Sequence, residues 1–143
     1  MLDAFAGSGA MGFELLSRGA LYAAFVDKDR KTCDRIKRTA KSLGVNTSEM
    51  SVICGDTARL AESSQLFGGP FDVVFLDPPY AVEAEVVSKL LKDLTQAGSL
   101  TKDAVVVYEH SHKSDSLSLD NFELSKSKRY GIAQVDLLVR CEG

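Results

Sequence analysis

The sequence alternates short apolar runs with amphipathic stretches over roughly its first 110 residues, and this alternation constrains the fold more than any other feature. Two parallel strands need a crossover of a dozen or more residues between them, so the pattern predicts strands joined by helices. We expect strands over residues 2–6, 23–26, 51–54, 71–76 and 104–108. We expect helices from the turn after the first strand to about residue 18, and over 30–43, 57–66 and 83–97.

The pattern changes after residue 110. Residues 111–120 are polar and serine-rich without apolar periodicity, which is typical of a loop. Two further strands are expected over 122–130 and 132–141, and because only Gly131 separates them they must form an antiparallel hairpin. The predicted fold class is α/β, with a mostly parallel seven-stranded sheet flanked by helices and ending in this hairpin. We expect one domain over residues 1–143.

Composition limits the classes of protein to consider. With 45% hydrophobic and 26% charged residues, the chain has an ordinary globular composition, and a net charge of −3 excludes a uniformly basic surface. Cys33, Cys54 and Cys141 have no C-x-x-C spacing, so neither a zinc site nor a disulfide framework is indicated. No apolar stretch approaches the roughly 20 residues that span a bilayer. We therefore expect a cytoplasmic protein, without membrane attachment or bound metal, that functions as a monomer.

A glycine-rich turn, GSGAMG over residues 7–12, lies between the first predicted strand and its helix. Glycines let a ligand approach the backbone closely, and a helix N-terminus offers free N–H donors. Asp27 follows Gly7 by 20 positions at the end of the second strand, where a carboxylate can accept hydrogen bonds from ribose hydroxyls. These features predict an adenosine-containing cofactor, and this spacing alone does not separate a dinucleotide from others.

Acidic residues also follow the third and fifth strands. Asp56 can accept a hydrogen bond from an adenine amino group, or it can serve as the N-cap of the helix that follows it. Glu109 ends the fifth strand beside the same cleft and has a weaker claim to a ligand. His110 and His112 are interpreted as loop residues rather than as metal ligands.

The fourth strand leads into Asp77-Pro78-Pro79-Tyr80. A carboxylate that accepts one N–H, and a fixed backbone carbonyl that accepts the other, would position an exocyclic amine of a nucleobase and favour its lone pair. The prolines fix the direction of that carbonyl, and Tyr80 can stack on an extruded base. The alternative is a structural turn after a buried strand, with Tyr80 in a packing role.

These motifs, in this order, resemble class I S-adenosylmethionine-dependent methyltransferases of the amino-methylating type. More closely, LDAFAGSGAMGFELLSRGA with FVDKD, DPPY and KRYG is similar to the RsmD-like family, bacterial methyltransferases that act on a guanine N2 of small-subunit ribosomal RNA. The resemblance covers essentially the whole chain. The family normally carries some tens of residues before the first strand, and these have no counterpart in this sequence.

The resemblance implies a role for each matching residue. Gly7, Ser8 and Gly9 would hold the methionine and ribose part of S-adenosyl-L-methionine, with Asp3 near its amino group, Asp27 on the ribose and Asp56 on the adenine. The catalytic set would be Asp77, Pro78, Pro79 and Tyr80. The full cofactor-binding set would be Asp3, Phe5, Gly7, Ser8, Gly9, Asp27, Lys28, Asp56, Thr57 and Asp77. The partner would be small-subunit ribosomal RNA, within an assembled or assembling particle.

Two basic stretches are candidates for RNA contact. Residues 28–41 hold seven Lys or Arg against two Asp, a pattern we interpret as a solvated helix face. Lys126, Lys128 and Arg129 in the hairpin are the better candidates, because phosphate contacts there would lie next to the fifth strand.

Three other functions remain open from the sequence. One is an adenine-N6 methyltransferase acting on DNA, since DPPY suits that amine equally well, although no separate target-recognition domain is visible. Another is a nicotinamide-dependent oxidoreductase, which the glycine spacing permits but which gives DPPY no role. The last is a catalytically incomplete module that binds the cofactor.

Overall fold

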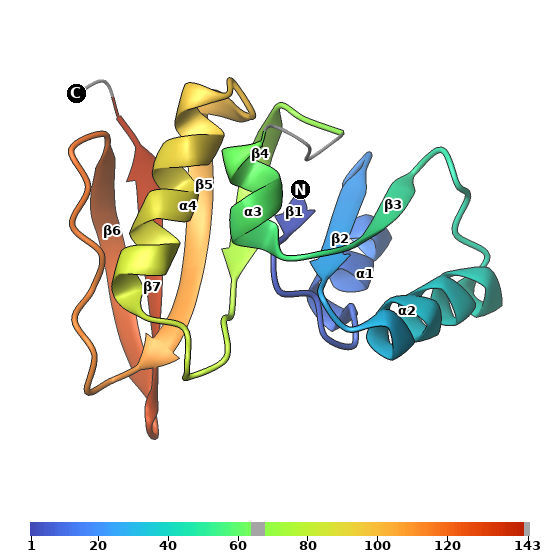
Figure 1. The fold of residues 1–143 in the computed structure, drawn as a ribbon, viewed down its shortest axis with the longest axis horizontal. Helices are drawn as coiled ribbons and strands as arrows, with labels where there is room; N and C mark the ends of the chain where they lie inside the picture. The colour runs from blue at the N-terminus through green and yellow to red at the C-terminus, as the bar shows by residue number, and fades with distance from the viewer. Residues whose placement is uncertain (64–67, 142–143) are drawn as a thin grey trace.

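The computed structural model describes residues 1–63 and 68–141, which form one seven-stranded sheet (Figure 1). Its strand order is β3-β2-β1-β4-β5-β7-β6. Pairing is parallel from β3 to β5 and antiparallel for β5 with β7 and for β7 with β6. The strands are β1 (Leu2–Asp3), β2 (Ala23–Asp27), β3 (Met50–Cys54), β4 (Phe71–Leu76), β5 (Leu100–Ser111), β6 (Phe122–Tyr130) and β7 (Ala133–Arg140). The predicted α/β fold with a C-terminal antiparallel hairpin is confirmed.

Helices cover both faces of the sheet. The α3 (Thr57–Glu62) and α4 (Ala84–Gln96) helices share a buried cluster with β4 and β5, in which Val87, Leu90 and Leu94 pack against strand residues. On the opposite face, α1 (Ala10–Ser17) and α2 (Arg30–Leu43) contribute to a second cluster around Phe25 and Ile36. Among the described residues, no helix has both the length and the apolar character needed to cross a membrane.

Three predicted elements differ from the structure by more than one residue at an end. The strand expected over 2–6 is limited to β1, because Ala4 N–H donates to the Phe75 carbonyl and Ala6 N–H to the Val26 carbonyl outside a regular ladder. The helix expected over 57–66 ends with α3 at Glu62, and residues 64–67 lie outside the described part of the chain. The strand expected over 104–108 is extended to Leu100–Ser111, since β7 pairs with it as far as Ser111.

The first helix packs unusually close to β2. A Cβ atom at Gly12 would lie 2.3 Å from Cε1 of Phe25, a separation that no real contact allows. Gly12 is buried within α1, and Phe25 is fully buried below it. The third glycine of the turn therefore sets the distance between helix and sheet, while Gly7 (φ 55°) and Gly9 (φ 80°) supply the left-handed backbone of the turn itself.

The hairpin carries a bulge that decides which side chains share a face. Pairing shifts between Leu124, which lies opposite Leu138, and Lys126, which lies opposite Leu137. After this shift Lys126 and Lys128 lie opposite Leu137 and Val135, while Ser127 lies opposite the buried Asp136. Directly paired residues lie on the same face of a sheet, so the two lysines share the face of Val135 and Glu109.

Changing Gly12→Ala should lower the free energy of unfolding by about 1–3 kcal/mol, because overpacking against the Phe25 ring outweighs the better helix propensity of alanine. Chemical denaturation followed by circular dichroism measures this cost. In a Phe25→Leu background the same change should cost less, because the atom that clashes is removed. Equal costs in both backgrounds would contradict the close packing as the cause.

Candidate functional site

A pocket of ≈ 860 Å³ lies at the carboxyl ends of the parallel strands, the edge at which open α/β sheets bind ligands. It brings together nearly all the cofactor-binding and catalytic residues predicted from the sequence. Those that line it are Asp3, Phe5, Gly7, Ser8, Asp27, Lys28, Asp56, Thr57, Asp77, Pro78, Pro79 and Tyr80. Gly9 does not line the pocket; it is the N-cap residue of α1, and its amide N–H donates to the Ala6 carbonyl at 2.8 Å.

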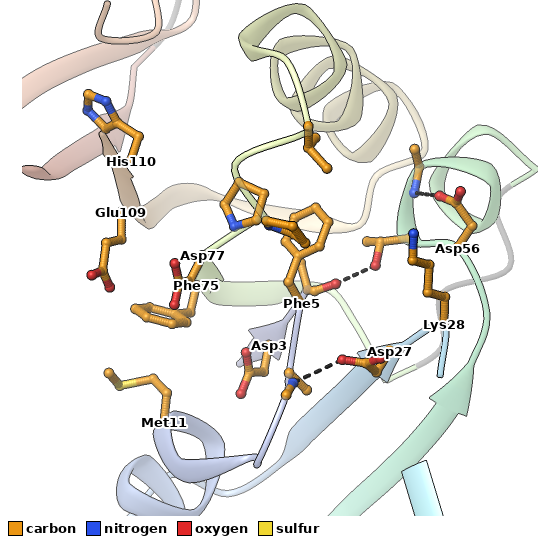
Figure 2. A pocket seen from close by; sticks show the side chains of 18 of the residues that line it. Asp3, Phe5, Met11, Asp27, Lys28, Asp56, Phe75, Asp77, Glu109 and His110 are labelled. Atoms are coloured by element: carbon orange, nitrogen blue, oxygen red, sulfur yellow. Dashed lines mark hydrogen bonds between the residues drawn. The ribbon is translucent and has the colours of Figure 1, made fainter. Parts of the chain in front are cut away.

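The pocket has two sides (Figure 2). Asp27, Lys28 and Asp56 lie on one side, and Asp77, Glu109, Phe75 and Met11 lie on the other, with Asp3 and Phe5 between them. The first side is formed by the ends of β2 and β3, and the second by the ends of β4 and β5 together with α1. A ligand that fills both sides would therefore bridge the glycine turn and the DPPY segment.

Asp27 holds the glycine turn in place. Its Oδ2 accepts the N–H of Gly7 at 3.0 Å, and its Oδ1 accepts the N–H of Asp29 at 3.0 Å. A carboxylate has about four acceptor positions, so these two bonds leave capacity for hydroxyl groups of a ligand. The residue predicted to bind a ribose thus also fixes the backbone that surrounds it.

Asp56 has the N-cap role predicted for it and also faces the pocket. Its Oδ1 accepts the Ala58 N–H at 3.0 Å at the start of α3. Thr57, expected to contact the cofactor, also lines the pocket, and its hydroxyl donates to the carbonyl of Ala4. That bond ties the start of α3 to the chain leaving β1.

Asp3 is a buried carboxylate without a hydrogen-bond partner. It is 1% exposed, and neither of its oxygens is bonded to any residue in the described ranges. Burial raises the pKa of Asp3 to about 7; the nearby Gly12 N–H, which lies outside hydrogen-bonding geometry, opposes this shift, while Asp77 and Asp27 add to it. A group this costly to bury calls for a donor from a ligand, and a cationic ammonium group fits best.

The DPPY segment presents one free carbonyl and one exposed ring. The Pro79 carbonyl accepts the Val82 N–H at 2.9 Å, whereas no hydrogen bond among the described residues engages the carbonyl of Pro78. Tyr80 is 76% exposed, so the interpretation of its ring as core packing is wrong. Partial desolvation in the pocket raises the pKa of Asp77.

Glu109 was expected at the end of the fifth strand beside the cleft, and His110 in a loop. Both lie within β5, which extends through Ser111, so the loop assignment of His110 is wrong. Glu109 lines the pocket beside Asp77, while the His110 ring turns away from the Glu109 carboxylate (Figure 2). His110 is buried, stacks on Tyr108 and shares a 2.7 Å contact between its Nε2 and Asp136 Oδ2. The only sequence signal for the pairing of His110 with Asp136 was the position of Asp136 within an otherwise apolar predicted strand.

The basic candidates lie outside the pocket. Lys126 and Lys128 project from β6 on the face that carries Glu109, and the Lys128 ammonium lies 5.1 Å from the centroid of the Tyr130 ring. Arg129 lies on the opposite face, where its Nε donates to the Gly131 carbonyl at 2.8 Å. In the described ranges, no group of three or more His, Cys, Asp or Glu side chains is arranged to hold a metal ion.

A glycine turn, an acid after β2 and DPPY after β4, on a sheet with a C-terminal antiparallel hairpin, define an S-adenosylmethionine-dependent methyltransferase of the α/β class. The sequence profile of the family described as Conserved hypothetical protein 95 matches residues 1–139. The chain belongs to this family, which is the RsmD family suggested by its motifs.

Known proteins agree with this assignment. The ribosomal RNA small subunit methyltransferase D of Haemophilus influenzae is 31% identical over 137 residues, covering 95% of this chain and 69% of that protein. A solved structure from the same organism has a TM-score of 0.87 at 30% identity, covering 99% of this chain and 86% of its own. A magnesium protoporphyrin IX methyltransferase from Synechocystis, solved with bound S-adenosylmethionine, has a TM-score of 0.70 at 18% identity and covers 97% of this chain and 68% of its own, which shows the shared fold.

The raised pKa of Asp3 predicts a pH-dependent loss of stability. Between the ordinary pKa of 3.8 and about 7, the folded protein binds a proton that the unfolded chain has released, so this group makes folding weaker as pH rises. The parent should lose this stability as pH rises, and Asp3→Asn should not. The unfolding free energy of Asp3→Asn minus that of the parent should therefore increase by roughly 4 kcal/mol between pH 4 and pH 8, at about 1.4 kcal/mol per pKa unit. Urea unfolding across this range measures the difference.

The exposed Asp103 provides the matched control, since Asp103→Asn should follow the parent at every pH. If the curve for Asp3→Asn also runs parallel to that of the parent, Asp3 is ionised in the folded protein and the desolvation argument is incorrect.

Proposed function

We propose that the protein transfers a methyl group from S-adenosyl-L-methionine to the exocyclic N2 amine of a guanine in small-subunit ribosomal RNA. The observation that carries this proposal is the Asp77–Pro78 pair, which the parallel pairing of β4 with β1 places next to the Asp3 carboxylate and the glycine turn. The names of its relatives support ribosomal RNA as the substrate.

The residues present fit the cofactor. Asp3, buried and unpartnered, would accept hydrogen bonds from the ammonium group of the methionine part, and Asp27 would accept from the ribose hydroxyls. Asp56 and Lys28 would lie against the adenine side, and the Gly7–Ser8 backbone would approach the middle of the ligand. When bound, the cofactor supplies an electrophilic methyl group on a sulfonium sulfur.

Asp77 and Pro78 prepare the acceptor nitrogen. One N–H of the amine would donate to the Asp77 carboxylate and the other to the free Pro78 carbonyl, which turns the nitrogen lone pair toward the methyl group. The methyl group would pass to the nitrogen with the electron pair of the broken S–C bond left on sulfur, and the nitrogen would give up one proton. Asp77 can accept that proton, because its raised pKa brings it nearer to neutral pH.

Tyr80 and the hairpin would hold the RNA. The exposed Tyr80 ring would stack on the target base once it is unstacked from its neighbours, a contact worth ~1–3 kcal/mol. Lys126 and Lys128, on the sheet face that carries Glu109, would contact phosphates on the same approach to the pocket. Arg129 faces the other way and would contribute little to this surface.

The setting of the reaction is also a proposal. We infer that residues 1–143 act as one methyltransferase domain, since all the proposed contacts lie on a single sheet. The expected substrate is RNA within an assembled or assembling small-subunit particle, met by a monomer in the cytoplasm. Such particles present a folded RNA surface that a pocket and one flanking hairpin can read.

Incubation with methyl-labelled cofactor and small-subunit particles from a strain lacking the modification tests the proposal. We expect labelled N2-methylguanosine after digestion of the RNA, and its loss in Asp77→Ala with affinity for S-adenosylhomocysteine within a few-fold of the parent. Asp27→Ala should weaken that affinity by ~1–3 kcal/mol, through lost hydrogen bonds.

Other labels would overturn the assignment. Labelled N6-methyladenosine, or label only in added DNA, would replace guanine N2 as the acceptor. A loss of cofactor affinity in Asp77→Ala would remove Asp77 from contact with the amine.

The hairpin makes a separate prediction. Lys126→Ala with Lys128→Ala should raise the KM for particles and reduce the slope of log affinity against log salt by about one per lysine, because each phosphate contact releases a counterion. Filter binding at several salt concentrations measures the slope. The control is Lys37→Ala with Lys41→Ala on the exposed face of α2, on the β3 side of the sheet. Equal slopes for the two pairs would exclude the hairpin as an RNA contact.

A further inference from the structure

Guanine and adenine differ at the edge that the proposed reaction must approach. Beside its N2 amine, guanine carries N1–H, a second donor, whereas N1 of adenine is an acceptor. An enzyme that reads an extruded base does so through hydrogen bonds to this edge. A site for guanine N2 therefore gains selectivity from a second acceptor, placed one atom along from the group that holds the amine.

The strand register places a second carboxylate at such a position. Leu76 lies opposite Tyr108 in the parallel pair of β4 and β5, so the next residues, Asp77 and Glu109, are neighbours on the same face. Both line the pocket, and Figure 2 shows their carboxylates on the side that also carries Phe75 and Met11.

Glu109 has no other evident use. No hydrogen bond or ion pair in the described ranges involves its carboxylate, and its neighbour His110 is committed to Asp136 on the opposite side of the strand. Burial, and then the proximity of Asp77, raise the pKa of Glu109, so the two acids share one space. The unpartnered Asp3 carboxylate opens into the same pocket, which shows that its floor is arranged for donors from a ligand.

We propose that Glu109 is a specificity-determining residue that accepts the N1–H of the target guanine while Asp77 accepts from its N2 amine. This inference rests on the proposed function, since it names the base that the same pocket selects. An adenine in this position would place its N1 lone pair against the Glu109 carboxylate, and the repulsion would exclude it.

The test uses 2-aminopurine, which keeps the 2-amine of guanine but has an acceptor at N1. Small-subunit RNA is ligated from segments with guanine or 2-aminopurine at the modified position and assembled into particles. The ratio of kcat/KM for guanine over 2-aminopurine is then measured for the parent and for Glu109→Gln. A glutamine amide can donate to the N1 of 2-aminopurine, so the ratio should fall by about tenfold or more. The other differences between the two bases affect both proteins and cancel in this comparison.

Glu123→Gln is the matched control, since Glu123 is exposed on β6 outside the pocket, and it should keep the parental ratio. Glu109→Asp keeps the charge, and it should retain a preference for guanine. Binding of S-adenosylhomocysteine and thermal unfolding should remain close to the parent in Glu109→Gln.

The outcomes separate the two proposals. If the parent fails to methylate the guanine-containing particle, the proposed function itself is incorrect. If it succeeds and Glu109→Gln keeps the parental ratio, Glu109 does not read N1. Loss of S-adenosylhomocysteine binding in Glu109→Gln would assign the carboxylate to the cofactor, and would equally overturn the inference.

Discussion

The parallel pairing of β1 with β2 on one side and β4 on the other is the constraint on which the site depends. Asp3 lies opposite both Phe25 and Phe75. Asp27 and Asp77 each come two residues after those partners, so side-chain alternation directs all three acids to the same face at the carboxyl ends of the strands. A slip of one residue in either pairing would turn an acid to the other face of the sheet.

The acids along this edge fall into two kinds. Asp27 and Asp56 accept backbone N–H groups and so stabilise the loops that carry them. Asp3 and Glu109 have no partner in the described ranges, and burial raises the pKa of each. Asp27 and Asp56 thus stabilise the loops around the pocket, whereas Asp3 and Glu109 keep their hydrogen-bonding capacity for ligands. The folded protein is less stable at neutral pH for keeping the second kind, as expected of a site preorganised for binding.

Local patterns predicted the sheet and most of the site because their signals lie within short stretches of the chain. The α2 helix and β6 begin and end where their periodicity and turn residues indicated. The features that sequence reasoning missed depend on partners far apart in the chain. The length of β5 is set by β7, the burial of His110 by Asp136, and the neighbourhood of Glu109 by Asp77. The bond from the Thr57 hydroxyl to the Ala4 carbonyl is a further example, since the two residues are far apart in the sequence.

The bulge in β6 has a consequence for how the hairpin can evolve. Side chains alternate between the two faces along a strand, so the extra residue between Leu124 and Lys126 determines on which face each later side chain of β6 lies. Without it, Lys126 would lie opposite Asp136, and Lys126 and Lys128 would move to the face covered by α4. Substitutions can change the positive charge of this surface gradually. An insertion or deletion of a single residue here would instead transfer both lysines to the other side of the sheet.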